Sequence, residues 1–175
     1  MWIDDVWHRR AWDWEKIPRL IGTWKRISGG RPFWLKGIQS VDGAKKAVEV
    51  GCDGIVVGNH AGRQVDGAIA RLDALENIVA AVGDKMYIMY DSGIRGAADV
   101  VKALALGAKF VWVGRLWVWD LSVMGGPGVR HVMKGLLADF NILMNVAEIR
   151  PCRCASRLFA FDCGRTILGF LSSET

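Results

Sequence analysis

Hydrophobic residues in this chain follow two repeating patterns that alternate along the sequence. Short runs of β-branched, aromatic and other apolar residues predict four strands, at residues 33–38, 55–57, 86–90 and 110–113. Between these runs, apolar residues recur three and four positions apart, as they do on one face of a helix. The sequence therefore predicts that strands and helices alternate, with no hairpin between strands.

The helical repeats define the elements between and around the strands. Helices are predicted at residues 14–24, 41–50, 72–82 and 97–106. Asp13 is the expected N-cap of the first helix, in spite of Pro18 near its start. A glycine directly follows each of the other three helices, as is common at a helix C-terminus.

The widest apolar stripe lies closer to the end of the chain. Its members are Val129, Val132, Met133, Leu136, Leu137, Phe140, Leu143 and Met144. This spacing predicts a long amphipathic helix from about Gly128 to Val146, lying on the sheet. From Ile149 onward no period persists. We therefore expect an N-terminal extension at 1–12, a partial barrel domain at 13–148 and a divergent, poorly ordered tail at 149–175.

Four βα units in a row correspond to half of a TIM (β/α)₈ barrel, an α/β fold with eight parallel strands. A half-barrel has two open sheet edges, and an open edge exposes backbone groups that can pair with another chain. The pattern thus predicts a homo-oligomer, or association with a partner through these edges.

A polar loop follows the second predicted strand. Ile55 to Val57 are continuous and β-branched, which is typical of a strand buried on both faces of a parallel sheet. His60, Arg63 and Asp66 come next, crowded between glycines. Because α/β folds build their sites at the carboxyl ends of the strands, this loop is the first candidate for chemistry.

Four stretches of the chain resemble one known family, in the same order. Asn59-His60-Ala61-Gly62-Arg63-Gln64 is similar to the Asn-His-Gly-Gly-Arg-Gln motif of the FMN-dependent α-hydroxy-acid dehydrogenases and oxidases. Lys36-Gly37 precedes it, and Asp91-Ser92-Gly93-Ile94-Arg95 and Gly114-Arg115 follow. This family includes glycolate oxidase, lactate oxidase and lactate 2-monooxygenase.

The resemblance runs from about Asp13 to about Asn145. Within it, the local sequence is most similar to that of fungal lactate-monooxygenase-like members. It implies that the four βα units are the C-terminal half of the barrel, strands five to eight. It also implies oxidation of a small L-2-hydroxy acid, of the lactate or glycolate class, to the 2-oxo acid. The alternative is an inactive truncated homologue that binds FMN weakly or acts only as an interaction module.

The resemblance gives His60 and Arg63 roles toward the substrate. It implies that His60 is the general base, and a neutral imidazole suits this role near neutral pH. It implies that Arg63 holds the substrate carboxylate, which its planar fork can bind through two parallel hydrogen bonds. Without a catalytic role, His60 would be a loop histidine hydrogen-bonded to the backbone, and Arg63 would be a surface arginine paired with Asp66.

The cofactor implied is FMN. The residues assigned to it are Lys36, Gly58, Asp91, Ser92, Gly93, Ile94, Arg95, Gly114 and Arg115. Lys36 would stabilise negative charge on the reduced flavin ring, although a lysine at a strand end is ordinarily just solvated. The loops with Arg95 and Arg115 would bind phosphate, as loops after the last barrel strands commonly do. Asp91 would bind the ribityl chain.

The chain departs from the family motif at two positions. Gly58 replaces a serine, which removes a hydroxyl near the flavin and should weaken cofactor binding. Ala61 replaces the first loop glycine, which we expect to be a mild change.

Composition excludes several other classes of protein. The 175 residues are 51% hydrophobic, enough for a core, and the net charge of +5 is scattered without a basic stripe, so nucleic-acid binding is not expected. No apolar stretch approaches the roughly 18 residues of a membrane span. The four cysteines include no Cys-x-x-Cys pair, so no metal site is predicted.

The two ends of the chain bear on its location. The N-terminus lacks the apolar core of a signal peptide, and the C-terminal Ser-Ser-Glu-Thr is not the Ser-Lys-Leu peroxisomal signal. We therefore expect an intracellular and most simply a cytoplasmic protein.

Overall fold

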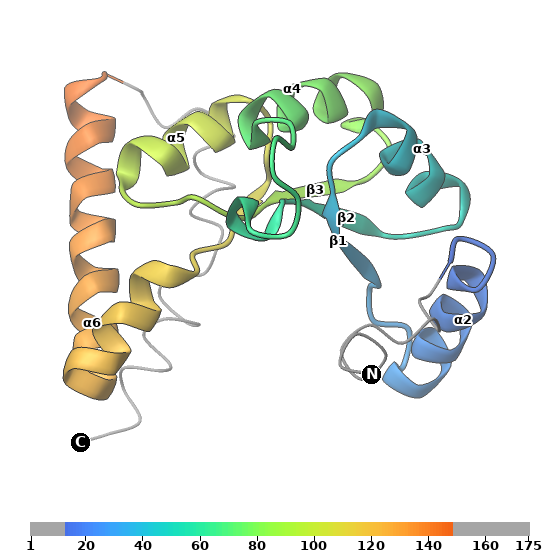
Figure 1. Ribbon diagram of the computed structural model, residues 1–175, viewed down its shortest axis with the longest axis horizontal. Coiled ribbons are helices and arrows are strands. Elements are labelled where there is room, and N and C mark those ends of the chain that lie inside the picture. The colour runs from blue at the N-terminus through green and yellow to red at the C-terminus, as the bar shows by residue number, and fades with distance from the viewer. Residues whose placement is uncertain (1–12, 149–175) are drawn as a thin grey trace.

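The structure is a computed structural model, and it describes residues 13–148 (Figure 1). In chain order its elements are α2 (Ile17–Ser28), β1 (Trp34–Ile38), α3 (Val41–Glu49), β2 (Gly54–Val57), the 3₁₀ turn η1 (His60–Gly62), α4 (Arg71–Val82), β3 (Tyr87–Tyr90), α5 (Ala97–Ala105), β4 (Phe110–Val111) and α6 (Arg115–Val146). The predicted alternation of strand and helix is confirmed. The predicted extension at 1–12 and tail at 149–175 lie outside the described residues.

The four strands form one parallel sheet in the order β1-β2-β3-β4. Ile55 of β2 pairs with Leu35 of β1 on one side and with Ile88 of β3 on the other. Neighbouring strands that are also consecutive in sequence, each joined by a helix, are the repeating unit of a (β/α)₈ barrel. The fold is therefore a partial barrel, as predicted.

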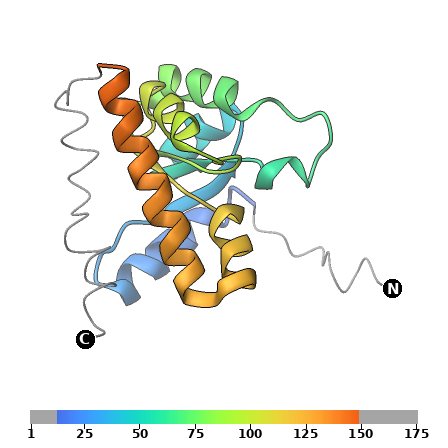
Figure 2. The same ribbon diagram turned by 90° about the vertical axis from the view of Figure 1, so that its left-hand side faces the viewer.

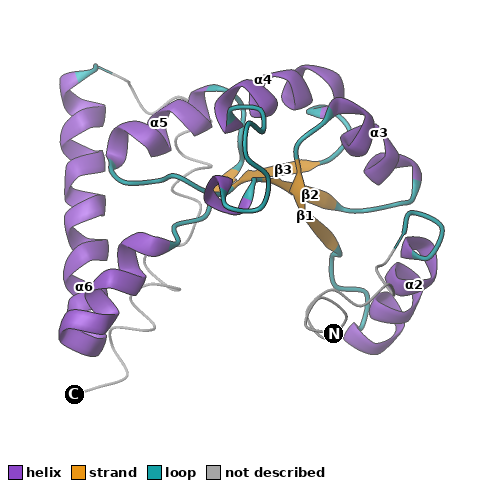
Figure 3. Cartoon of the chain, in the orientation of Figure 1, coloured by secondary structure: helices purple, strands orange, loops and turns teal. Residues whose placement is uncertain are grey.

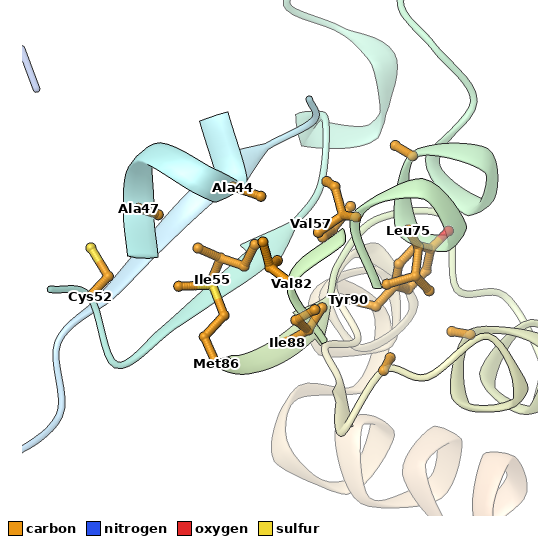
Figure 4. Packing of buried hydrophobic residues seen from close by; sticks show 14 of the residues in the cluster. Ala44, Ala47, Cys52, Ile55, Val57, Leu75, Val82, Met86, Ile88 and Tyr90 are labelled. Atoms are coloured by element: carbon orange, nitrogen blue, oxygen red, sulfur yellow. The ribbon is translucent and has the colours of Figure 1, made fainter. Parts of the chain in front are cut away.

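Helices α3, α4 and α5 lie along one side of the sheet (Figures 1 and 3). The core forms where they meet the strands, and its largest fully buried side chains are Ile55, Leu75, Ile78, Ile88, Val57 and Val82 (Figure 4). Complete burial of such a side chain stabilises the fold by about 1.5–3 kcal/mol. This packing holds the strand ends, and the loops that follow them, in fixed positions.

Aromatic rings gather on the opposite face of the sheet. Trp34 and Tyr87 are both registered with Gly54, and their ring centroids lie 5.3 Å apart. A Cβ on Gly54 would stand 2.5 Å from the Tyr87 carbonyl oxygen, so the glycine permits this close approach. Tyr87 is 42% exposed and Trp112 is 47% exposed. This face is therefore only partly covered by the described residues.

The first helix differs from its prediction at both ends. It begins at Ile17 rather than near Trp14, because Pro18 occupies the first turn, where a missing N–H costs least. The Asp13 side chain accepts the N–H of Lys16, just before the helix. The helix continues to Ser28, where Gly29 ends it with a φ of 71°.

The long helix α6 also differs from its prediction. It consists of two helical segments that meet at a break at Gly125, whose φ is 64° and ψ is −146°. The segment after the break, ending at Val146, is the predicted helix, whereas the segment that begins at Arg115 was not predicted. The eight residues of the predicted stripe are buried or half-buried, so the prediction of which helix face is covered is confirmed. The prediction that this helix lies on the sheet is wrong: α6 packs chiefly against α5 (Figure 1). β4 is the last strand of the described sheet, so the sheet offers α6 no surface beyond it.

None of the helices within residues 13–148 is long and apolar enough to cross a membrane. α6 has the required length, but it carries charged side chains on several of its turns.

Candidate functional site

The candidate residues follow the carboxyl ends of the four strands. Since all four strands are parallel, these ends lie at the same edge of the sheet. Lys36 lies near the end of β1, Gly58 directly follows β2, Asp91 directly follows β3, and Gly114 lies beyond β4. Figure 3 shows the loops that leave this edge.

The loop that carries His60 is tied to its neighbours by hydrogen bonds. Asn59 caps the turn, its Oδ1 accepting the N–H of Gly62 at 3.0 Å. The N–H of Ala61 donates to Oγ of Ser92 at 3.1 Å, which links this loop to the loop after β3. His60 and Ala61 have φ values of 54° and 64°, in the left-handed region that favours glycine. These bonds offset the cost of that conformation, about 1–3 kcal/mol for each residue.

The His60 side chain lies beside the end of β1. A Cβ added to Gly37 would stand 3.6 Å from His60 Cε1, so the imidazole packs next to the glycine that follows Lys36. Within residues 13–148 the ring makes no hydrogen bond, and both of its nitrogens remain available. The structure thus brings the Lys36-Gly37 and Asn59-His60 motifs together.

Arg63 lies on the segment that projects away from the sheet after η1 (Figure 2). Its side chain is exposed and has no ion-pair partner in the described part of the chain. The alternative to a substrate role was an ion pair between Arg63 and Asp66, but the Asp66 side chain instead accepts the N–H of Gly67 at 3.0 Å. The guanidinium is therefore free to bind an anion.

Lys36 and Asp91 form an ion pair across β2. The Lys36 side chain is 48% exposed and that of Asp91 only 15%. The Asp91 carboxylate is therefore the more buried partner, and part of the Lys36 side chain remains exposed to solvent. Two residues assigned to the same cofactor from separate motifs are thus in direct contact.

Gly58 is buried against Asp91. An added Cβ at position 58 would stand 3.2 Å from the Asp91 Cβ and 3.4 Å from its Oδ2. A serine, as in the family motif, would therefore put its hydroxyl next to this carboxylate. Without that hydroxyl, Lys36 is the only described side chain that pairs with Asp91.

The loop after β3 has the geometry of an anion site. Ser92 and Gly93 have φ values of 85° and 74°, and the N–H groups of Gly93 and Ile94 have no hydrogen-bond partner within residues 13–148. The Ile94 side chain is buried in the core, so only its backbone can serve a ligand. Arg95 is exposed and, within residues 13–148, has no ion pair. Successive free amides next to a cation are a common anion-binding arrangement.

Two acidic residues fix the other end of this loop. Asp99 accepts the N–H of Arg95 at 2.9 Å, and Asp139 of α6 accepts the N–H of Ala97 at 3.0 Å. These two amides are therefore not available to a ligand. Asp99 could have been suspected from its place in the first turn of a helix, but nothing in the sequence relates Asp139 to Ala97.

The loop after β4 adds further cationic and backbone groups. Gly114 precedes α6, and Arg115 is the first residue of the helix, exposed and without an ion pair among the described residues. β3 and β4 pair side by side, with the N–H of Trp112 donating to the Tyr90 carbonyl at 2.8 Å. The loops with Arg95 and Arg115 thus leave adjacent strands at one edge.

The sequence analysis missed Arg71 and Tyr90, which lie behind the loop after β3. Tyr90 is buried, and this burial raises the pKa of its hydroxyl, while the charge of Arg71 and a hydrogen bond from it act in the opposite direction. Arg71 is the first residue of α4, outside every motif of the resemblance. No sequence signal pointed to either residue.

Comparisons with known proteins agree with this geometry. The family model described as FMN-dependent dehydrogenase matches residues 2–153. An FMN-dependent alpha-hydroxy acid dehydrogenase of Penicillium citrinum is 47% identical over 95% of this chain, and 2-hydroxyacid oxidase 1 of Mus musculus is 47% identical over 70% of it. The chain spans 39% and 33% of these two relatives.

A solved structure of mandelate oxidase aligns with 78% of the chain and 42% of its own length, at 41% identity and a TM-score of 0.70. Its description names an FMN adduct. Two relatives named for 2-hydroxy acid chemistry thus share sequence with this partial barrel, and one solved structure shares both sequence and fold with it. The chain belongs to the FMN-dependent dehydrogenase family.

Proposed function

We propose that this chain supplies the FMN-binding and substrate-binding half of a barrel that oxidises small L-2-hydroxy acids, of the lactate or glycolate class, to 2-oxo acids. The observation that carries the proposal is the meeting of separate motifs at one sheet edge, with Lys36 paired to Asp91 and His60 packed beside Gly37. Relatives named L-lactate oxidase and 2-hydroxyacid oxidase support this substrate class.

The groups at the sheet edge fit FMN chemically. Within residues 13–148 the amides of Gly93 and Ile94 have no hydrogen-bond partner and the guanidiniums of Arg95 and Arg115 no ion pair, so these groups suit a phosphate dianion. Lys36 would place a positive charge beside the flavin ring, and Asp91 would hold the ribityl hydroxyls while anchoring Lys36. Gly58 leaves the ring side of the site without a hydroxyl, which should weaken binding.

His60 and Arg63 would act on the substrate. Arg63 binds the carboxylate through two parallel hydrogen bonds and so orients the acid. His60 accepts a proton from the 2-hydroxy acid on an imidazole nitrogen that has no hydrogen-bond partner within residues 13–148. The oxidising capacity would come from bound FMN, which would take up two electrons and the remaining hydrogen of the 2-hydroxy acid as the 2-oxo acid forms.

A second function is favoured by a different observation. Trp34, Tyr87 and Trp112 are partly exposed on the sheet face opposite the helices, and β1 and β4 are edge strands of the described sheet. These features suit an inactive homologue that binds FMN weakly and associates through its open edges, most simply with a second copy. Light scattering distinguishes the two: a cooperative, monodisperse monomer would remove the interaction hypothesis.

The activity is tested by anaerobic flavin reduction with lactate, glycolate and longer 2-hydroxy acids, after reconstitution with FMN and, where needed, a complementary first half of the barrel. His60→Ala should lose about 10²–10⁴ in rate. Arg63→Lys should mainly weaken substrate binding, because a point charge cannot reproduce the two-pronged contact. His131→Ala, exposed on α6, is the matched control. If His60→Ala reduces flavin as fast as that control, His60 is not the base.

A further inference from the structure

Arg71 makes an unusual contact with the loop after β3. A Cβ added to Gly93 would stand 2.3 Å from Nη2, 2.5 Å from Cζ and 2.5 Å from Nη1 of Arg71. The end of the guanidinium, with its central carbon and both terminal nitrogens, therefore lies directly against Gly93. Every side chain larger than hydrogen at position 93 would therefore displace Arg71.

The other side of the guanidinium is held by the core. Arg71 donates a hydrogen bond to the hydroxyl of Tyr90, a residue only 3% exposed at the end of β3. Tyr90 is followed by Asp91, Ser92 and Gly93, so the arginine bridges the last residue of the strand and the turn that comes three residues later. The first turn of α4 is thereby fixed to the loop after β3.

We propose that Arg71 is a positioning residue for phosphate binding, which holds the left-handed Ser92–Gly93 turn so that the free amides of Gly93 and Ile94 point to one ligand. This inference rests on the proposed function, because it takes the loop after β3 as the phosphate site. Ser92 and Gly93 both have positive φ; glycine adopts this conformation freely, but at Ser92 it persists only when surrounding contacts enforce it. Arg71 supplies such a contact from outside the loop, and Ser92 supplies another through Ala61.

A coupling experiment tests the contact itself, without any ligand. Gly93→Ala should lower the melting temperature by roughly 2–6 °C, because it strains the backbone at a φ of 74° and also displaces the end of the Arg71 side chain. In an Arg71→Ala background only the backbone strain remains, so the same substitution should cost measurably less. Equal costs in the two backgrounds would overturn the inference.

A second measurement tests the effect on the ligand. The dissociation constant of inorganic phosphate, and then of FMN, is determined by calorimetry at a temperature where every variant is folded. Arg71→Met should weaken binding about tenfold, or about 1.4 kcal/mol, because the turn is no longer held with its two amides directed at one ligand. Tyr90→Phe should weaken it by a smaller factor, because the guanidinium loses its anchor but remains present. Lys85→Met, an exposed position before β3, controls for the loss of one positive charge.

The Tyr90 hydroxyl gives a spectroscopic readout. The chain has two tyrosines, so in a Tyr87→Phe background the alkaline absorbance change reports Tyr90. Arg71→Met should shift this titration to higher pH, because the arginine lowers the pKa of Tyr90. Unchanged phosphate affinity in Arg71→Met relative to Lys85→Met would overturn the inference. Failure of the wild-type chain to bind phosphate would instead refute the proposed phosphate site, whatever the coupling of positions 71 and 93.

Discussion

The N-terminus of α5 is capped by a residue from another helix, and this cap can be removed by one substitution. Gly96 precedes α5 and has no side chain to cap it, while Oδ2 of Asp139 on α6 accepts the N–H of Ala97 at 3.0 Å. Asp139→Ala should therefore release the first turn of α5 and loosen the chief packing contact of α6. The loop after β3 leads directly into this turn.

Two separate contributions give the magnitude. Loss of a side-chain cap costs about 0.5–2 kcal/mol, and loss of a negative charge at a helix N-terminus costs about 0.3–1 kcal/mol at a solvent-accessible site. Because the two overlap in one carboxylate, we expect Asp139→Ala to lower the free energy of unfolding by about 1–2 kcal/mol. Asp139→Asn keeps an acceptor oxygen and should lose only the charge, about 0.3–1 kcal/mol.

Thermal unfolding followed by far-UV circular dichroism measures both variants. At this chain length, 1 kcal/mol corresponds to a shift of about 2–4 °C in Tm. Glu76→Ala, at an exposed position within α4, controls for the removal of an acidic side chain. The carboxylate is not a cap if Asp139→Ala has the same Tm as that control, or if Asp139→Asn lowers Tm as much as Asp139→Ala does.

Three further substitutions test local features. Ala61→Gly should stabilise the fold by up to about 1 kcal/mol in urea unfolding, because the φ of 64° suits glycine; no gain would contradict that conformation. The pKa of Asp53 is lowered chiefly by the N–H of Phe33, so its stabilisation is complete above about pH 4 and is lost as the pH falls through the lower folded value. Asp53→Asn should therefore flatten the acid limb of stability against pH. Burial raises the pKa of Tyr90 above 10, so its contribution is lost as the pH rises past that value, and Tyr90→Phe should flatten the alkaline limb.

The strands and their direction could be predicted from sequence because each has a simple local cause. β2 is buried at all four positions, and its continuous apolar run has no other explanation in a short segment. Helical repeats between the strands require crossovers, and crossovers make neighbouring strands parallel. Boundaries differ from prediction by only a few residues wherever a glycine ends the element.

The placement of α6 shows where this reasoning fails. Its apolar stripe indicates correctly which face is buried, from Val129 to Met144. A periodic pattern contains no information on what covers that face, so α5 and the sheet were equally compatible with it. Residues 116–119, on the first turns of α6, have no clear apolar period, so the helical segment before Gly125 was not predicted.

Gly93 shows why the candidate site could be predicted only in part. A motif gives one reason for this glycine, the positive φ of 74° that the turn requires. The structure adds a second reason, the close contact with the guanidinium of Arg71, which lies 22 residues earlier and outside every motif. Such a contact depends on α4 and the end of β3 meeting in space, and no local pattern encodes it. Substitution of Gly93 alone would combine the two causes, whereas the pair with Arg71 separates the strain of the turn from the contact that holds it.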